Sequence, residues 1–213
     1  MTLSLREQHK QQTRAAISAA ATRLFAEHGF DQVTIAQVAE AAGVAKMTVT
    51  NYFPRKEDLV FDQADAVISQ LARTIASRPS GESYLAAVRR DYLVELAREN
   101  GTTGATSAAF AAMLQNTPAL ATRGAEIAYA REQALGDAIA AEQGTDSPEL
   151  RLVAAQLGAA HRVLYAEAAR RSLAGEPRLL IRTALSQAAE RVFGLLEPSI
   201  GTYGTCRSRT SGR

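Results

Sequence analysis

Residues 46–51, which read KMTVTN, combine side chains that can read the edges of DNA bases. Lysine reaches the acceptor atoms of guanine, asparagine pairs with adenine, and threonine or methionine can contact the methyl group of thymine. Such readout requires these side chains to lie on one exposed face of a helix that enters the major groove. We therefore expect double-stranded DNA to contact Lys46, Met47, Thr48, Thr50 and Asn51.

A helix-turn-helix that would present this face is predicted from the residues around it. Thr34 lies three residues before Gln37, which is the spacing of a capping box and predicts a helix that begins at Ile35. Gly43 supplies the turn, and a second short helix follows over about residues 45–53. The apolar residues that would hold the two helices together are Val38, Ala39, Ala42, Val44, Val49, Tyr52 and Phe53.

Residues 13–59 contain the segment LFAEHGFDQVTIAQVAEAAGVAKMTVTNYFPRKEDL and resemble the N-terminal domain of the TetR family of bacterial regulators. The resemblance implies phosphate contacts from Thr34 and Lys56, and groove contacts from residues 46–48 and Asn51. It further implies a DNA-binding transcriptional repressor that recognises a palindromic operator as a homodimer. A small hydrophobic effector would release such a repressor from DNA.

Several positions of this motif allow a second interpretation. The resemblance gives Tyr52 a packing role and a DNA-backbone contact, and a core position suits Tyr52 better than stacking on DNA, because a duplex reader needs no aromatic platform. Thr34 caps a helix in either case, Met47 is either a base contact or simply exposed, and each lysine alone would be an ordinary surface residue. Two positions depart from the family pattern: Ala45 replaces a frequent serine cap, and Thr50 replaces an aromatic residue that contacts phosphate.

Breaker residues divide the rest of the chain into further helices. Amphipathic stretches cover about residues 56–77, 81–99, 107–114, 118–143, 148–174 and 177–196. Together with a first helix over about residues 6–28, they predict an all-α fold. The domains we expect are a helix-turn-helix DNA-binding domain over 1–55, a helical ligand-binding and dimerisation domain over 56–197, and a disordered tail over 198–213.

Aromatic and apolar residues of the second domain predict a pocket for the effector. Small-molecule pockets have largely apolar walls and a few polar groups. The uncharged stretch from Thr102 to Thr122 is expected to be buried beside this pocket. The candidate ligand-binding residues are Phe61, Tyr84, Tyr92, Phe110, Met113, Leu114, Tyr129, His161 and Tyr165. Each aromatic residue also fits an ordinary core, and a single histidine there fits a structural role.

Two stripes of residues at helical spacing predict the homodimer. They consist of Leu150, Val153, Leu157, Ala160 and Leu164, and of Leu180, Ala184, Gln187, Arg191 and Leu195. Two such helices from each subunit would form a four-helix bundle, and the small residues 158–160 favour a close contact. The alternative is that the stripes face the core of their own chain. A dimer would read two half-sites in successive major grooves.

Composition argues against several other classes of protein. The formal net charge is only +2, so the inference of DNA binding rests on the motif. The three histidines are scattered and the single cysteine, Cys206, lies near the C-terminus, so we expect no enzyme, no metal site and no cofactor. No signal-peptide pattern opens the chain, and we expect a cytoplasmic protein that does not bind membranes. A helical small-molecule carrier is the alternative, but it would leave residues 46–51 unexplained.

Overall fold

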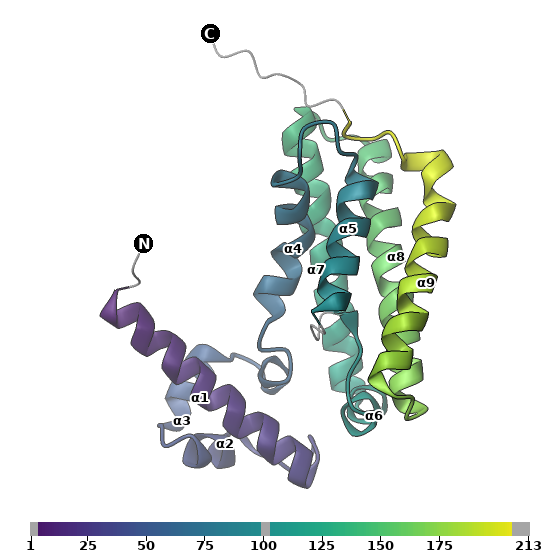
Figure 1. The fold of residues 1–213 in the computed structure, drawn as a ribbon. Helices are drawn as coiled ribbons and strands as arrows, with labels where there is room; N and C mark the ends of the chain where they lie inside the picture. Colours follow the sequence, from purple (N-terminus) through teal and green to yellow (C-terminus); the bar gives the residue numbers. More distant parts are fainter. Residues whose placement is uncertain (1–3, 99–102, 206–213) are drawn as a thin grey trace. The chain divides into compact units, whose positions relative to one another are not determined.

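The computed structural model describes residues 4–98 and 103–205, and every regular element within these ranges is a helix (Figure 1). This confirms the predicted all-α fold. The elements are α1 (Leu5–His28), α2 (Ile35–Ala41), α3 (Lys46–Tyr52), the 3-10 helix η1 (Lys56–Leu59), α4 (Ala64–Ala76), α5 (Tyr84–Ala97), α6 (Ala108–Asn116), α7 (Pro118–Gln143), α8 (Pro148–Leu173) and α9 (Arg178–Ile200).

The described chain forms two compact units. Unit 1 consists of Met1–Ala64 and Ala112–Gly124, and unit 2 consists of Asp65–Ala111 and Ala125–Arg213. This division differs from the expected boundary after residue 55. Leu59 and Leu120 are both buried in the apolar core of unit 1, so the segments that carry them belong to that unit.

Local signals set the boundaries of α2 and α7 as predicted. Thr34 Oγ1 accepts a hydrogen bond from the Gln37 amide at 3.3 Å, while Gln37 Oε1 accepts one from the Thr34 amide at 2.8 Å. This reciprocal pair satisfies two free donors of the first turn and starts α2 at Ile35. α7 covers the predicted residues 118–143.

The prediction of one helix over residues 56–77 is wrong at its start, where η1 and a turn precede α4. Asp58 accepts hydrogen bonds from the Arg55 amide at 3.1 Å and from Arg123 Nε at 2.9 Å. Leu59 is buried in the core of unit 1. These contacts with residues distant in sequence hold the segment in a shape that its helical spacing does not encode.

α9 continues through Pro198 to Ile200, so the prediction of a disordered tail is wrong for residues 198–205. Ile200 is buried, and the Tyr84 amide donates a hydrogen bond to the Tyr203 carbonyl at 2.9 Å. These two contacts hold the end of α9 and the following turn against the start of α5. Residues 206–213 lie outside the described residues.

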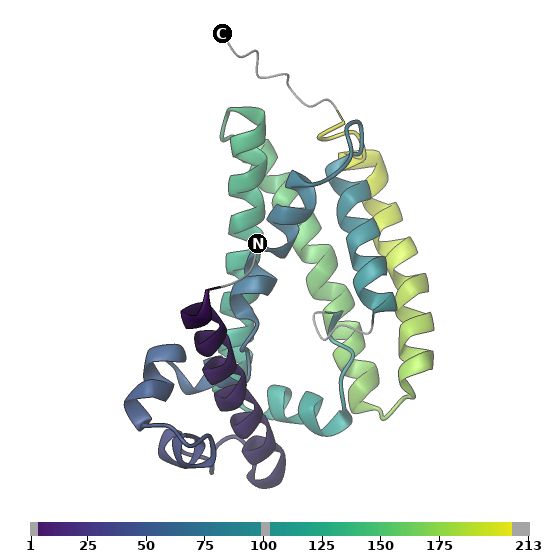
Figure 2. The ribbon, with the colours of Figure 1, turned by 60° about the vertical axis from the view of Figure 1, so that its left-hand side comes forward.

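The core of unit 2 is formed by the long helices α4, α5, α7, α8 and α9. α9 lies against both α8 and α5 (Figures 1 and 2). Fully buried leucines contributed by the five helices fill the centre, and they include Leu71, Leu85, Leu135, Leu157 and Leu185. A bundle of this kind supplies a large apolar interior in which any polar group requires a partner.

The first predicted dimer stripe faces this core, so its assignment to a subunit interface is wrong. Its five residues on α8 are all at most 8% exposed. A Cβ atom at Gly158 would lie 2.9 Å from Glu132 Oε2 on α7, which shows that this small residue serves a contact within the chain. Helical spacing identifies an apolar face but does not identify what covers it. The exposed large hydrophobic residues of α8 are instead Leu152, Val163 and Tyr165.

The uncharged stretch after Thr102 is largely at the surface, contrary to the prediction. Its buried residues are Thr103, Gly104, Ala111, Thr117 and Leu120. α6, which forms its middle, buries a single residue. Alanine and small polar side chains make a stretch uncharged without requiring burial, and this explains the error.

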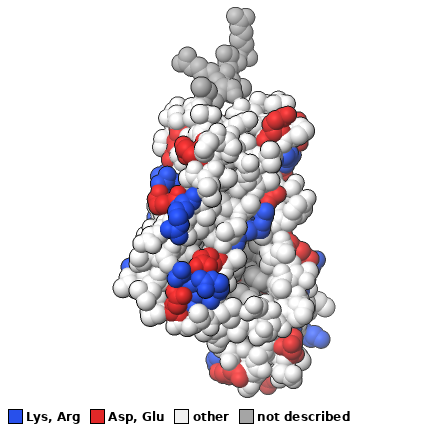
Figure 3. Space-filling model, turned by 90° about the vertical axis from the view of Figure 1, so that its right-hand side faces the viewer, with Lys and Arg blue, Asp and Glu red and all other residues white. Residues whose placement is uncertain are grey.

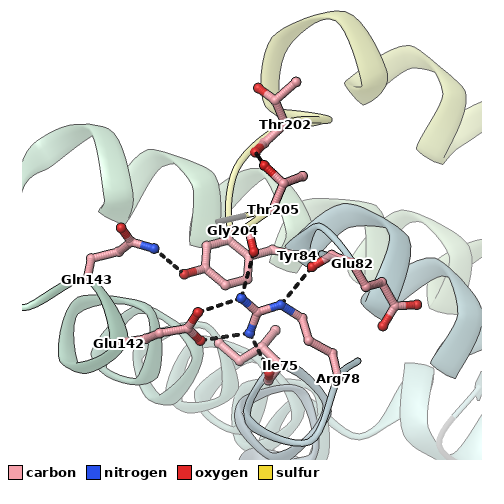
Figure 4. A network of polar contacts seen from close by, with 9 residues as sticks. All are labelled: Ile75, Arg78, Glu82, Tyr84, Glu142, Gln143, Thr202, Gly204 and Thr205. Carbon is pink, nitrogen blue, oxygen red and sulfur yellow. Dashed lines mark hydrogen bonds and ion pairs between the residues drawn. The ribbon is translucent and has the colours of Figure 1, made fainter. Parts of the chain in front are cut away.

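Arg78 closes one end of unit 2 by a fully satisfied network (Figure 4). The side chain is buried and forms a bidentate ion pair with Glu142 at 2.5 and 2.7 Å. The same guanidinium lies 4.4 Å from the centre of the Tyr84 ring. It also donates to the carbonyls of Ile75 at 2.5 Å, Glu82 at 2.9 Å and Gly204 at 2.8 Å. The network joins α4, α5, α7 and the turn after α9.

Candidate functional site

α3 is positioned on unit 1 by its buried face. Val49 and Phe53 are at most 1% exposed, and they pack in one core with Val38 and Ala39 of α2. The turn between α2 and α3 uses Gly43, whose φ of +67° lies in the left-handed region that favours glycine. The opposite face of α3 is therefore held outward by the packing of a small domain.

Arg14 secures the C-terminal end of α3, a role that was missed in the sequence. From α1 it donates hydrogen bonds to the Tyr52 carbonyl at 3.0 Å and the Asp62 carbonyl at 2.8 Å, and it lies 4.3 Å from the centre of the Phe53 ring. Ser18, one turn further along α1, donates to Asp62 Oδ2 at 2.5 Å. The available signal was a cation and a hydroxyl four residues apart beside the apolar stripe of α1.

The outward face of α3 carries the predicted base-reading residues. Lys46, Met47 and Asn51 are exposed, and Met47 is 70% exposed, so these side chains are free to enter a groove. Thr48 and Thr50 are half-buried. The Thr50 hydroxyl donates to the Met47 carbonyl at 3.0 Å, which leaves its oxygen able to accept a further hydrogen bond.

The two predicted phosphate-contacting residues lie on different elements. Thr34 is the N-cap of α2, and Lys56 is the first residue of η1. Thr34 is exposed and its hydroxyl is part of the capping box, so its capping role is confirmed. Lys56 Nζ lies 3.4 Å from the Asp31 carbonyl and 4.3 Å from the centre of the Phe30 ring. Partial burial lowers the pKa of Lys56, although Asp31 and Glu57 act in the opposite direction. Tyr52 is half-buried against the core of unit 1.

The nine predicted ligand-binding residues are distributed over both units. Phe61, Met113 and Leu114 pack against the core of unit 1, whereas the other six belong to unit 2. Tyr84 belongs to the Arg78 network, where its hydroxyl accepts a hydrogen bond from Gln143 Nε2 at 2.8 Å. Tyr129 is 62% exposed. Phe110 is half-buried, and the exposed Tyr165 packs beside Gly104, where a Cβ atom would lie 2.9 Å from its ring.

Tyr92 and His161 do meet in the interior of unit 2. Their ring centroids lie 5.4 Å apart in an edge-to-face arrangement, and both rings pack against Phe193. The hydroxyl of Tyr92 and Nε2 of His161 are buried and have no hydrogen-bond partner among the described residues. Burial lowers the pKa of His161 to about 3, and the positive charge of Arg131 contributes to this shift, so the imidazole is neutral at pH 7.

Arg131 on α7 is a second residue that was missed in the sequence. It is 6% exposed, and its Nε has no partner among the described residues. Burial lowers the pKa of Arg131 to about 10, and the nearby charge of Arg162 acts in the same direction. The side chain is still cationic at pH 7. An arginine in a long amphipathic helix normally lies at the surface, so no local pattern predicts this burial.

The described residues contain no group of three or more histidine, cysteine, aspartate or glutamate side chains that could hold a metal ion. Within the same ranges, no helix is long and apolar enough to cross a membrane.

The chain is similar to known regulators in sequence and in fold. Residues 17–62 match the model of bacterial regulatory proteins of the TetR family. The HTH-type transcriptional regulator TcmR of Streptomyces glaucescens is 28% identical over 147 residues, which cover 67% of this chain and 65% of TcmR. The chain thus spans slightly less than two-thirds of the length of this relative.

Two solved structures show the same fold. NalD, the secondary repressor of the MexAB-OprM multidrug efflux pump in Pseudomonas aeruginosa, aligns with a TM-score of 0.53 and 22% identity, over 88% of this chain and 95% of NalD. The fatty acid degradation regulator FadR from Bacillus halodurans aligns with a TM-score of 0.51 and 18% identity, over 87% of this chain and 98% of FadR. The helix-turn-helix and the match to the family model identify residues 17–62 as a DNA-binding domain of the TetR-family type, and the solved structures show that the chain shares their fold.

Proposed function

We propose that the protein is a transcriptional repressor that binds a palindromic operator through α3 and is released by a small effector. The observation that carries this proposal is the outward face of α3, where a cation, an amide and a flexible thioether are exposed on a rigidly packed helix. A protein that only carried small molecules would have no use for this face. The match to the TetR-family model and the role of NalD as a repressor support repression.

A homodimer is part of the proposal, because two-fold symmetry allows two copies of α3 to read two half-sites. Exposed apolar residues on α8 and α9 support it, and they are Leu152, Val163, Leu180 and Leu195, each at least 56% exposed. Figure 3 views the chain from the side on which α9 lies and shows broad uncharged areas between small groups of charged residues. Contiguous exposed apolar surface favours association with a partner. The dimer surface that we propose therefore keeps the predicted stripe of α9. On α8 it uses Leu152 and Val163 in place of the predicted stripe.

The effector is assigned to unit 2, where Tyr92 and His161 bring unpartnered polar atoms into an apolar interior. Release from DNA requires the effector to bind the conformation that fits the operator less tightly than the alternative conformation. A coupling free energy of about 1–3 kcal/mol weakens operator binding by roughly 5- to 150-fold. The same factor must weaken effector binding when operator is present, because the linkage is reciprocal.

The test is to select bound sequences from random duplexes and measure the affinity of variants for the selected site. Asn51→Ala should change the preferred base at one position of each half-site. Lys56→Ala should weaken binding to all duplexes alike and reduce the salt slope by about 1. Arg170→Ala, which removes an exposed cation of α8, is the matched control and should change neither property.

Two results would contradict this assignment. Equal losses on selected and random DNA for Asn51→Ala would remove its base-reading role. A stoichiometry of one chain for each operator duplex would contradict the dimer and, with it, the palindromic operator.

A further inference from the structure

Arg131 lies in the interior of unit 2 with a buried donor that has no acceptor. The residue is 94% buried, and its Nε has no hydrogen-bond partner among the residues that the structure describes. The adjacent acid on α7, Glu132, is already bound by Arg162, whose Nη1 lies 2.5 Å from Glu132 Oε2. The nearest obvious counter-charge in the sequence is therefore engaged elsewhere.

Arg78 shows what the same unit provides for an arginine with a structural role. Its guanidinium is buried to a similar degree but has a carboxylate and three carbonyl oxygens as acceptors (Figure 4). Isolated charges in a protein interior cost several kcal/mol, and proteins normally pair them. The absence of any such partner around Arg131 indicates that a partner from outside the chain completes its coordination.

Two neutral groups accompany this cation. Tyr92 and His161 are each at least 95% buried, their rings are 5.4 Å apart, and the Tyr92 hydroxyl and His161 Nε2 have no partner among the described residues. Arg131 is close enough to His161 for its charge to affect that imidazole. Buried polar atoms without partners are rare in proteins and require an explanation. Three of them, contributed to the interior of unit 2 by α5, α7 and α8, point to one common ligand.

The chemistry of the three groups defines the ligand. A guanidinium offers parallel N–H donors that match the two oxygens of a carboxylate. A phenol and a neutral imidazole can each donate one further hydrogen bond to such an anion. The Phe193 ring, which packs against both Tyr92 and His161, supplies an apolar surface for the remainder of the molecule.

We propose that Arg131, together with Tyr92 and His161, binds the carboxylate of a small organic acid inside unit 2. The inference rests on the proposed function, since it names the chemical class of the effector assigned to that unit. It also changes the expectation of a largely apolar effector, because the ligand now requires a negative charge.

The experiment compares carboxylates with uncharged amides of the same shape by calorimetric titration of the full chain without DNA. The probes are decanoate with decanamide, and 2-naphthoate with 2-naphthamide. At least one carboxylate should bind about 10-fold more tightly than its amide, since charge-assisted hydrogen bonds exceed neutral ones by more than about 1.4 kcal/mol. Arg131→Met should abolish this preference, Arg131→Lys should reduce it, and Arg170→Met should retain it.

The outcomes separate this proposal from the proposed function. If neither carboxylate is preferred to its amide, or if a folded Arg131→Met protein keeps the preference, the carboxylate site is wrong. Folding of each variant is checked by its cooperative thermal transition, and Arg131→Lys provides a second variant that keeps the charge. If a carboxylate binds through Arg131 but does not change operator affinity, the site is supported and its role in releasing DNA is contradicted.

Discussion

Unit 2 contains two buried arginines, and the protein treats them in opposite ways. Arg78 has its donors engaged by Glu142 and by carbonyls from three other segments, whereas the buried Nε of Arg131 has no acceptor among the described residues. Arg78 therefore stabilises the fold, whereas Arg131 keeps a donor available for a ligand. The role of a buried charge is therefore indicated by its partners, because both arginines are removed from solvent.

The largest expected effect comes from removing the satisfied arginine. Arg78→Met should lower the free energy of unfolding by about 3–5 kcal/mol, because it removes the counter-charge of Glu142 and the side-chain donor to three carbonyls. Chemical denaturation monitored by circular dichroism measures the change. Arg170→Met, which removes an exposed ion pair with Glu167, should change stability by less than about 0.5 kcal/mol. A similar small loss for Arg78→Met would contradict its structural role.

The neutral histidine beside Arg131 should make the stability of the protein depend on pH. Burial lowers the pKa of His161 from 6.5 to about 3. Between these values the unfolded chain binds a proton that the folded chain excludes, so stability falls as the pH falls. The contribution should be about 1.4 kcal/mol between pH 7.5 and 5.5.

This pH dependence is measured by repeating the denaturation over that range with variants of two histidines. His161→Phe keeps a ring in the aromatic cluster and should lose the contribution, while His28→Gln, at an exposed position on α1, should keep it. An unchanged slope in His161→Phe would show that the imidazole is accessible to protons in the folded state.

The smallest expected effect has the opposite sign to that of Arg78. Arg131→Met should raise the free energy of unfolding by about 1 kcal/mol in the absence of ligand, since it replaces an unpaired buried cation by an apolar side chain of similar length. The same denaturation experiment compares both methionine variants. A loss of more than about 1 kcal/mol would mean that Arg131 already has a structural partner.

Local sequence signals were sufficient for the DNA-binding helices. Thr34 and Gln37 set the start of α2, Gly43 sets the turn, and Lys46, Met47 and Asn51 are exposed on α3 as predicted. Each of these features depends on residues a few positions apart. The whole candidate reading face could therefore be placed before any tertiary contact was known, although its contacts with DNA stay predictions.

Features of unit 2 that depend on distant contacts were not predicted. The apolar stripe of α8 was recognised, but its spacing could not tell the chain's own core from a second subunit. Nothing adjacent to Arg131 in the sequence indicates that its Nε lacks a partner. The turn after α9 was also missed, because its contacts with Tyr84 and Arg78 join segments far apart in sequence.

The Arg78 network also has a consequence for how the protein folds during its synthesis. Gly204, which supplies one of its acceptors, follows Arg78 by 126 residues. At ordinary translation rates the ribosome needs about 6–25 s to make the intervening segment. Throughout that interval the guanidinium lacks this partner and stays hydrated. Unit 2 can therefore bury Arg78 in its final form only after the turn beyond α9 has been synthesised, however early α4 and α5 begin to fold.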